Sequence, residues 1–211
     1  MTRLFTPLRI GLLAALAATI VAGFVLVPAG VALPIHWNLV GEADIFLPRE
    51  WALLIPAVVA IFVWGLFLGI DRFASAQDRE RGVYITGVVF TALTALLLSI
   101  AVVTVLIGIG VAVSMVQVIA LGLAVLLLVL GNALPKSRPN SLAGIRVPST
   151  LRSESNWQAT HRLGGRLIMA GGLVLLVAAL LVPQQWLFWW VIGCVLLPIL
   201  AATLNSLAYR D

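Results

Sequence analysis

The stretch Leu121-Gly-Leu-Ala-Val-Leu-Leu-Leu-Val-Leu130 contains ten consecutive residues without a charged or polar side chain. It does not alternate between apolar and polar positions, as a strand of a membrane barrel would, so it predicts a membrane-spanning helix. Of the 211 residues in the whole chain, 62% are hydrophobic and only 10% are charged, and the mean hydropathy is +1.14. These values lie far from those of a soluble domain, which predicts an integral membrane protein and excludes a large globular enzyme.

Similar apolar runs recur along the chain, and clusters of charged residues separate them. A helix crosses a bilayer in roughly 20 residues. The runs cover residues 10–33, 51–70, 83–107, 111–131, 167–182 and 186–208, of which the fifth is the shortest. We therefore predict an all-α helical bundle with six transmembrane helices. It forms a single integral membrane domain over residues 1–211, with two spans in 1–70 and four in 83–211.

The basic residues are divided unequally between the two predicted sides of the membrane. One side holds only Arg49, in the connection at residues 34–50. The other side holds Arg3, Arg9, Arg72, Arg79, Arg81, Lys136, Arg138, Arg146, Arg152, Arg162, Arg166 and Arg210. Because basic residues gather on the cytoplasmic side, we expect both termini and the connection at residues 132–166 to be cytoplasmic. This bias also explains the net charge of +5 without nucleic-acid binding.

The first run has some features of a signal peptide. Arg3 and Arg9 precede it, and Gly30-Val31-Ala32 has the small residues of a cleavage site. The run exceeds 20 apolar residues, however, and this length favours a retained anchor.

The interiors of the six runs contain no Asp, Glu, Lys, Arg or His. This argues against a proton-coupled pump or an ion-driven antiporter, because such proteins need ionisable groups within the membrane. We expect the Ser and Thr hydroxyls in the runs to bond to their own helices. Gln117 is the one polar side chain large enough to suggest another role. Recognition is therefore expected at the membrane faces, in the two long connections.

The connection at residues 34–50 is the predicted outer loop. Pro34 and Gly41 predict a compact chain that follows the membrane surface. Histidine and carboxylates could bind zinc or another divalent ion, but the spacing of His36, Glu42 and Asp44 fits no standard metal motif. We favour a hydrogen-bonded network that holds a binding surface, without a metal or other cofactor. The candidate ligand-binding residues are His36, Trp37, Asn38, Glu42 and Asp44.

The connection at residues 132–166 is the predicted cytoplasmic loop. Its prolines and Gly144 interrupt any helix in the first half. The capping-box spacing that begins at Ser155 predicts a short amphipathic helix at the interface, with Trp157 and His161 on one face. The basic side chains are expected to contact the lipid bilayer, and the loop is too short for a DNA-reading module. Docking of a partner protein is an alternative, with candidate residues Asn132, Asn140, Arg146, Trp157, His161 and Arg162.

Two separate motifs in these connections resemble a known family. The pattern Leu33-Pro34-x-His36-Trp37-Asn38-x-x-Gly41-Glu42-x-Asp44 is similar to the N-terminal signature of SdpI-type membrane proteins. A second set of residues resembles the C-terminal signature of the SdpI family. It comprises Gly131-Asn132-x-x-Pro135-Lys136, Asn140, Gly144-Ile145-Arg146-x-Pro148-x-Thr150-Leu151 and Trp157-x-x-Thr160-His161-Arg162. One departure is Ser149, which stands where the family commonly has tryptophan.

The resemblance implies a bacterial multi-pass protein of the cytoplasmic membrane that gives immunity against a secreted peptide toxin of the SdpC type. It also implies signal transduction, in which the toxin-bound protein recruits a cytoplasmic repressor. On this hypothesis the outer loop binds the toxin, the inner loop contacts the repressor, and the protein is not an enzyme. Two alternatives are a membrane enzyme that uses His36, Glu42 and Asp44 on a peptide or lipid, possibly with a metal ion, and a carrier or channel for small apolar peptides.

Overall fold

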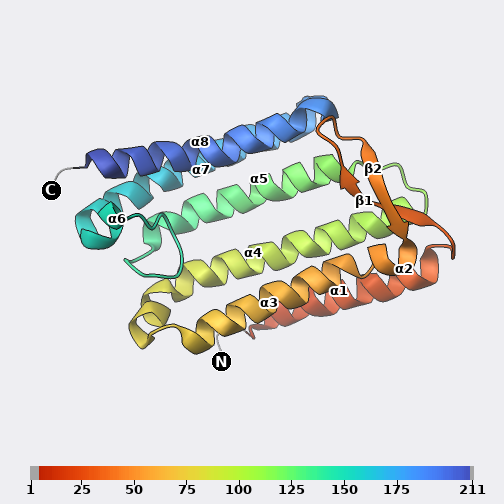
Figure 1. Ribbon diagram of the computed structural model, residues 1–211, viewed down its shortest axis with the longest axis horizontal. Helices are drawn as coiled ribbons and strands as arrows, with labels where there is room; N and C mark the ends of the chain where they lie inside the picture. The colour runs from red at the N-terminus through yellow and green to blue at the C-terminus, as the bar shows by residue number, and fades with distance from the viewer. Residues whose placement is uncertain (1–4, 210–211) are drawn as a thin grey trace.

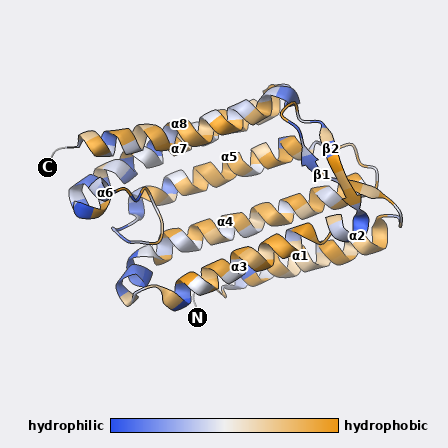
Figure 2. Ribbon diagram, viewed as in Figure 1, coloured by the Kyte–Doolittle hydropathy of each residue, from blue (hydrophilic) through white to orange (hydrophobic). Residues whose placement is uncertain are grey.

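The computed structural model describes residues 5–209, which form a bundle of helices lying side by side (Figure 1). Among these described residues, six helical segments are long and apolar enough to cross a membrane, which confirms the predicted six-span bundle. The long helices in these segments are α1 (Pro7–Leu26), α3 (Ile55–Phe73), α4 (Ala76–Gly108), α5 (Met115–Ala133), α7 (Glu154–Leu181) and α8 (Gln184–Ala208). Figure 2 shows apolar residues along the helices and polar residues mainly at the two ends of the bundle.

The short elements lie at the ends of the bundle. A two-stranded sheet, β1 (Ala32–Trp37) and β2 (Ala43–Pro48), lies next to the short helix α2 (Arg49–Ala52) at what we call the hairpin end (Figure 1). The 3-10 helix η1 (Leu134–Lys136) and helix α6 (Pro148–Arg152) lie at the opposite end. We call this the termini end, because α1 begins and α8 ends there. The arrangement fits the prediction that both termini share one side, while the identity of that side stays a prediction.

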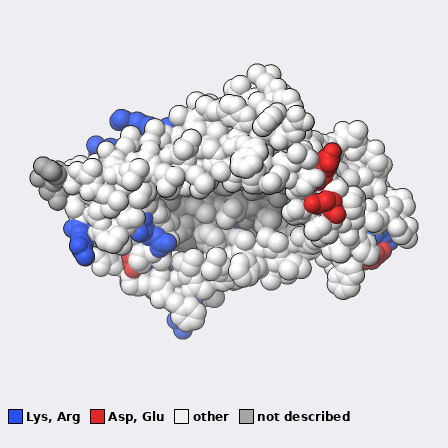
Figure 3. All heavy atoms as spheres, turned by 45° about the horizontal axis from the view of Figure 1, so that its top comes forward, with Lys and Arg blue, Asp and Glu red and all other residues white. Residues whose placement is uncertain are grey.

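The charges follow the same division. On the face that Figure 3 shows, most Lys and Arg atoms lie towards the termini end, and most Asp and Glu atoms lie towards the hairpin end. Between them is an uncharged stretch whose middle is hollowed. Arg3 and Arg210, which the orientation argument also used, lie outside the described residues.

Short polar side chains begin four of the long helices. Thr6 precedes α1, whose first residue is proline, and its hydroxyl accepts a bond from the Arg9 amide at 3.3 Å. Ser75, Ser114 and Ser153 cap α4, α5 and α7 in the same way, with distances of 3.0, 3.1 and 3.2 Å to the amides that they accept from. Each cap satisfies one of the amides that a helix start leaves without an intrahelical partner.

The outer connection is a β-hairpin, where the sequence predicted a compact loop. The first helix ends at Leu26 although the apolar run continues to residue 33. Pro28 and Gly30, whose φ is +84°, separate the helix from the strand. Leu33 then pairs with Leu47 across the antiparallel sheet and is buried against α2 and α4. Apolar composition alone did not distinguish this buried strand from the end of a helix.

The fifth span is longer than predicted. Helix α7 begins at Glu154 and continues without interruption to Leu181. The prediction of a separate interfacial helix around Trp157 is therefore wrong, because that segment is the first part of the span. Its polar side chains are accommodated by buried contacts with the preceding connection, so the helix does not lie on the membrane surface.

Two groups of helices share the buried core. The largest apolar cluster joins α5, α7 and α8, with Leu175 and Ala124 fully buried. Smaller clusters join α1, α3, α4 and the hairpin. Helix α4 has 33 residues, or about 50 Å, and meets both connections. At one end Gly108 packs closely against Val27 and Leu33, and at the other Asp78 accepts bonds from Ser141.

The polar residues within the spans mostly have structural roles. Six hydroxyls donate to carbonyls of their own helices, as expected: Thr19, Thr86, Thr91, Thr94, Ser99 and Thr104. Gln117 instead donates across to the Ala179 carbonyl of α7 at 2.9 Å. Arg9, which the sequence placed in a tail before the first run, lies in α1 and is buried, because the helix already begins at Pro7.

Candidate functional site

The hairpin turn is organised by Asn38. Its backbone amide donates to the Glu42 carbonyl at 2.8 Å, and its side-chain oxygen accepts from the amides of Val40 and Glu42 at 3.1 and 3.0 Å. Gly41 completes the turn with a φ of +84°, a conformation that favours glycine. The side chain of Asn38 therefore fixes the shape of the hairpin tip, which is a positioning role.

His36 and Asp44 face each other across the two strands. The Nδ1 atom of His36 lies 2.6 Å from the Oδ1 atom of Asp44, and the two side chains are 57% and 42% exposed. Both are therefore accessible to a ligand, with the carboxylate fixing the orientation of the imidazole. Glu42 is exposed at the turn. Among residues 5–209, no group of three or more His, Cys, Asp and Glu side chains is placed to hold a metal ion.

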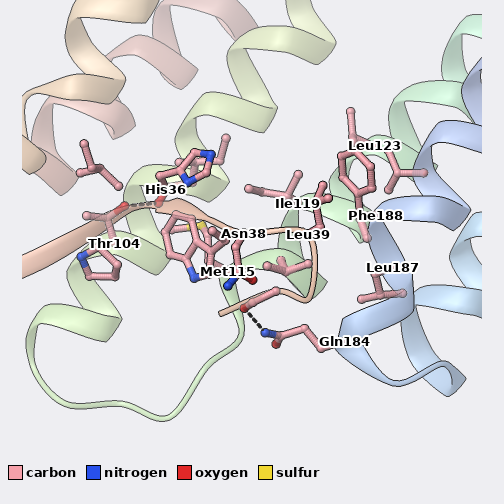
Figure 4. Close-up of a pocket in the computed structure, with 18 of the residues that line it drawn as sticks. His36, Asn38, Leu39, Thr104, Met115, Ile119, Leu123, Gln184, Leu187 and Phe188 are labelled. Carbon is pink, nitrogen blue, oxygen red and sulfur yellow. Dashed lines mark hydrogen bonds between the residues drawn. The ribbon is translucent and has the colours of Figure 1, made fainter. Parts of the chain in front are cut away.

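A cavity of about 400 Å³ lies beneath the hairpin (Figure 4). His36, Trp37 and Asn38 line it, so three of the five predicted ligand-binding residues meet one space, whereas Glu42 and Asp44 are not part of the lining. The remaining lining is mostly apolar and comes from α2, α3, α4, α5 and α8. It includes Ile55, Ile100, Thr104, Met115, Ile119, Leu123, Leu187, Phe188 and Val191. The cavity can therefore accept an apolar group beside a polar rim.

Gln184 connects the hairpin tip to the rest of the bundle. Its Nε2 atom donates to the Gly41 carbonyl, the bond drawn as a dashed line at Gln184 in Figure 4. Its Oε1 atom accepts from the Ser114 hydroxyl at the start of α5. A Cβ atom on Gly41 would lie 2.6 Å from Cγ of Gln184, so only glycine permits this approach. The tip is thereby held against the first turns of α5 and α8.

The sequence did not reveal the cavity, because its walls come from segments far apart in the chain. The apolar positions of Ile119 and Phe188 look like ordinary lipid-facing residues in their runs. Gln184 and Gln185 were the available signal, as polar residues in the short connection between the last two spans. The partners of Gln184 became evident only once the hairpin was placed.

At the termini end, Trp157 and His161 are fully buried. Their rings stack with centroids 4.0 Å apart, and the indole Nε1 donates to the Ser137 carbonyl at 3.2 Å. The His161 Nε2 atom accepts from the Ile145 amide at 3.1 Å, while Nδ1 lies 2.7 Å from the Trp157 carbonyl. An acceptor at Nε2 and a donor at Nδ1 require the neutral imidazole. These two residues fold the connection onto α7, a role that the predicted interfacial position did not include.

Asn140 and Gly144 complete this packing. Asn140 is buried, and its side-chain oxygen accepts from the amides of Leu142 and Ala143 at 2.8 and 2.9 Å. Gly144 has a φ of +117°, and a Cβ atom there would lie 2.5 Å from Nε2 of His161. The connection is thus an ordered structure built around α7.

The other three predicted partner-binding residues, Asn132, Arg146 and Arg162, are exposed. The predicted set therefore divides into a buried half that shapes the connection and an exposed half that is available for contact. Ser149, where the family commonly has tryptophan, lies 2.6 Å from Ser206 of α8, measured between the hydroxyl oxygens.

The six apolar helices found within residues 5–209, with polar structures at both ends, define a multi-pass helical membrane protein. Residues 136–206, about a third of the chain, match the sequence model of the SdpI/YfhL protein family. The matched region contains α6, α7 and most of α8, together with Asn140, Arg146, Trp157, His161 and Arg162; the hairpin lies outside it.

A curated relative is the immunity protein SdpI of Bacillus subtilis (strain 168). It is 27% identical to this chain over 85 residues, which are 40% of this chain and 41% of that protein. The alignment therefore spans about two fifths of the relative's length. No solved structure matches the chain.

Proposed function

We propose that this protein gives immunity against a secreted peptide toxin of the SdpC type, which it binds at the hairpin end. The match of residues 136–206 to the SdpI/YfhL family model and the likeness to an immunity protein support this class of function. The hairpin end is the outer face in this proposal, and the termini end is cytoplasmic, in agreement with the distribution of basic residues.

The cavity beneath the hairpin is the observation that carries the proposal. It combines an apolar lining from membrane-embedded helices with His36, Trp37 and Asn38 on a surface hairpin. A peptide that inserts an apolar side chain would bury it against Ile119, while its polar backbone stays near the rim. The exposed pair of His36 and Asp44 adds hydrogen-bonding groups beside the entrance.

Signal transduction to a cytoplasmic repressor is the second part of the proposal. Helix α4 contacts the hairpin through Gly108 and the cytoplasmic connection through Asp78, so it joins the two regions directly. Toxin binding would shift the connection only if the toxin has unequal affinity for two arrangements of these contacts. Arg146 and Arg162 are exposed for a partner. In a reporter strain with the cognate repressor, replacing both by alanine should abolish induction and preserve protection.

Survival of a toxin-sensitive bacterium that expresses this protein tests the immunity. The wild type should protect against an SdpC-type toxin, and Ile119→Trp, which fills the cavity, should not. Ile61→Trp is the matched control, because Ile61 is 73% exposed on α3 and should tolerate the same substitution. Membrane levels of all variants are compared by immunoblot. Equal protection by the two tryptophan variants would contradict the proposed binding site, and no protection by inserted wild type against any such toxin would contradict the function.

A further inference from the structure

The cavity beneath the hairpin has a floor, two walls and a cover. Helices α4 and α5 form the floor, where Met115 and Ala120 are only 3% and 1% exposed. One wall is the start of α3, with Ile55, and the other is the start of α8, with Phe188 (Figure 4). Residues 34–39 of the hairpin belong to the cover.

The two walls are separated from each other. Helix α3 packs on α4, and α8 packs on α5 and α7, but among residues 5–209 α3 and α8 do not pack extensively together. The wall residues Ile55 and Phe188 are 37% and 38% exposed. The cavity is therefore open between α3 and α8, on the side away from α4 and α5. Figure 3 shows that the surface between the ends of the bundle is hollowed and uncharged on the face that it displays.

This opening lies at the depth of one lipid leaflet. The lining on α5 extends from Met115 to Leu123, which is about 12 Å along the helix axis. The hydrocarbon core of a bilayer is about 30 Å thick, so the cavity stays within the half that is nearer to the hairpin. Because both walls belong to segments that can span the membrane, the opening faces hydrocarbon rather than water.

The aqueous side of the cavity, in contrast, is covered by a hairpin that is held at its tip and at its base. At the tip, Gln184 donates to the Gly41 carbonyl. At the base, the Arg49 amide donates to the Val31 carbonyl at 3.0 Å, and the side chain of Leu33 is only 1% exposed. A ligand that comes from water has to pass this cover, whereas a ligand that comes from the bilayer does not.

We propose that the ligand of this cavity enters sideways from the bilayer, between α3 and α8, as a membrane-inserted apolar peptide. The inference rests on the proposed function, because this ligand is the toxin of that proposal. An apolar segment already dissolved in the leaflet reaches Ile119 and Phe188 without exposure to water. His36 and Asn38 then meet the polar groups of the peptide at the membrane surface. The site thereby selects peptides that partition into the membrane over peptides that stay in water.

Photolabelling from the lipid phase tests the opening without any peptide. The full chain is reconstituted in nanodiscs with phosphatidylcholine that carries a diazirine on an acyl chain, and mass spectrometry locates the labelled residues after irradiation. Ile119 in the cavity should be labelled, as should Leu197, which is 67% exposed on α8, whereas the fully buried Leu175 should not. Ile55→Trp narrows the opening and should largely abolish the label on Ile119, while Ile61→Trp, at a 73% exposed position of the same helix, should leave it unchanged. An unlabelled Ile119 beside a labelled Leu197 would overturn the proposal.

Delivery of the peptide from the membrane tests the route. A labelled SdpC-type peptide is inserted either into the vesicles that contain the protein or into separate vesicles of the same lipid, at the same total concentration. Binding should be at least about tenfold slower from separate vesicles, because the peptide must first leave the apolar bilayer for water. Equal rates would show an aqueous route and overturn the proposal. No binding from either set of vesicles would contradict the toxin site itself, whereas labelling of Ile119 would still support the opening to the bilayer.

Discussion

His36 at the hairpin end and His161 at the termini end have opposite environments. The His36 ring is 57% exposed and contacts Asp44, whereas His161 is fully buried and both of its ring nitrogens lie within hydrogen-bond distance of backbone groups. The tryptophans differ in the same direction, since Trp37 lines a cavity and Trp157 is enclosed. The same residue types are thus accessible in one polar connection, whereas in the other they are buried and organise the chain. Burial distinguishes the two roles.

The largest expected difference between the two ends is their accessibility from outside the cell. In a Cys194→Ser background, a cysteine at Glu42 should react with an impermeant maleimide in whole cells. A cysteine at Ser141 should react only after the membrane is permeabilised. Both positions are exposed, so membrane sidedness alone decides the result. The reverse pattern would place the hairpin in the cytoplasm and contradict the proposed toxin site.

Truncation of the two tryptophans should separate stability from function. Trp157→Ala removes a fully buried ring and is expected to lower the free energy of unfolding by about 3–5 kcal/mol. Trp37→Ala should cost much less, because that side chain is only half-buried, yet it should reduce protection. Thermal unfolding in detergent measures the first effect and survival measures the second. Similar losses of stability in both variants would remove the distinction between the two ends.

A pair of glycines tests how closely the connection at residues 132–166 packs. Gly144→Ala combines a positive φ with a contact to His161 and should lower the free energy of unfolding by about 1–3 kcal/mol. Gly30→Ala is the matched control: its φ is also positive, but no atom lies within 4 Å of the added Cβ. Thermal melts should therefore show a larger loss for Gly144→Ala. Equal losses would mean that the positive φ alone determines the loss of stability at both sites.

The smallest expected effect on stability comes from the histidines themselves. His161→Gln should lower the free energy of unfolding by about 0.5–1.5 kcal/mol, the usual net value of a hydrogen bond. His36→Gln should change it by no more than about 0.5 kcal/mol, because surface substitutions rarely do more. Denaturation of both variants in detergent measures which substitution lowers the free energy of unfolding more. A greater loss at His36 would show that the hairpin depends on the pair with Asp44 for its folding.

The sequence predicted the spans well because each is a long apolar run that can satisfy its own backbone hydrogen bonds within a helix. The sequence-based prediction failed where the same residue composition is compatible with two different secondary structures. The stretch from Ala32 to Ile35 is apolar enough to extend the first helix, yet it belongs to strand β1, which pairs with the next strand, β2, in the hairpin. Conversely, the polar start of α7 interrupted its run, although buried contacts hold it in the same helix as Leu175.

The candidate site was predicted only in part for a similar reason. His36, Trp37 and Asn38 stand out in a short polar connection, and the structure places them around one cavity. The walls contributed by Ile119 and Phe188 carry no local signal, since apolar residues are expected everywhere in a span. Arg9 was missed because a basic residue before an apolar run normally indicates orientation, whereas here the helix begins early enough to bury it.

Binding of a labelled SdpC-type peptide to the purified protein in lipid nanodiscs tests the central claim most directly. Titrations compare the wild type with His36→Gln and Ile119→Trp at the hairpin end, and with His161→Gln and Ile61→Trp as folded controls. The account predicts that each of the first two substitutions weakens binding about tenfold or more, a difference of about 1.4 kcal/mol, while the controls bind as the wild type does. Unchanged affinity in both hairpin-end variants, or an equal loss in the controls, would contradict it.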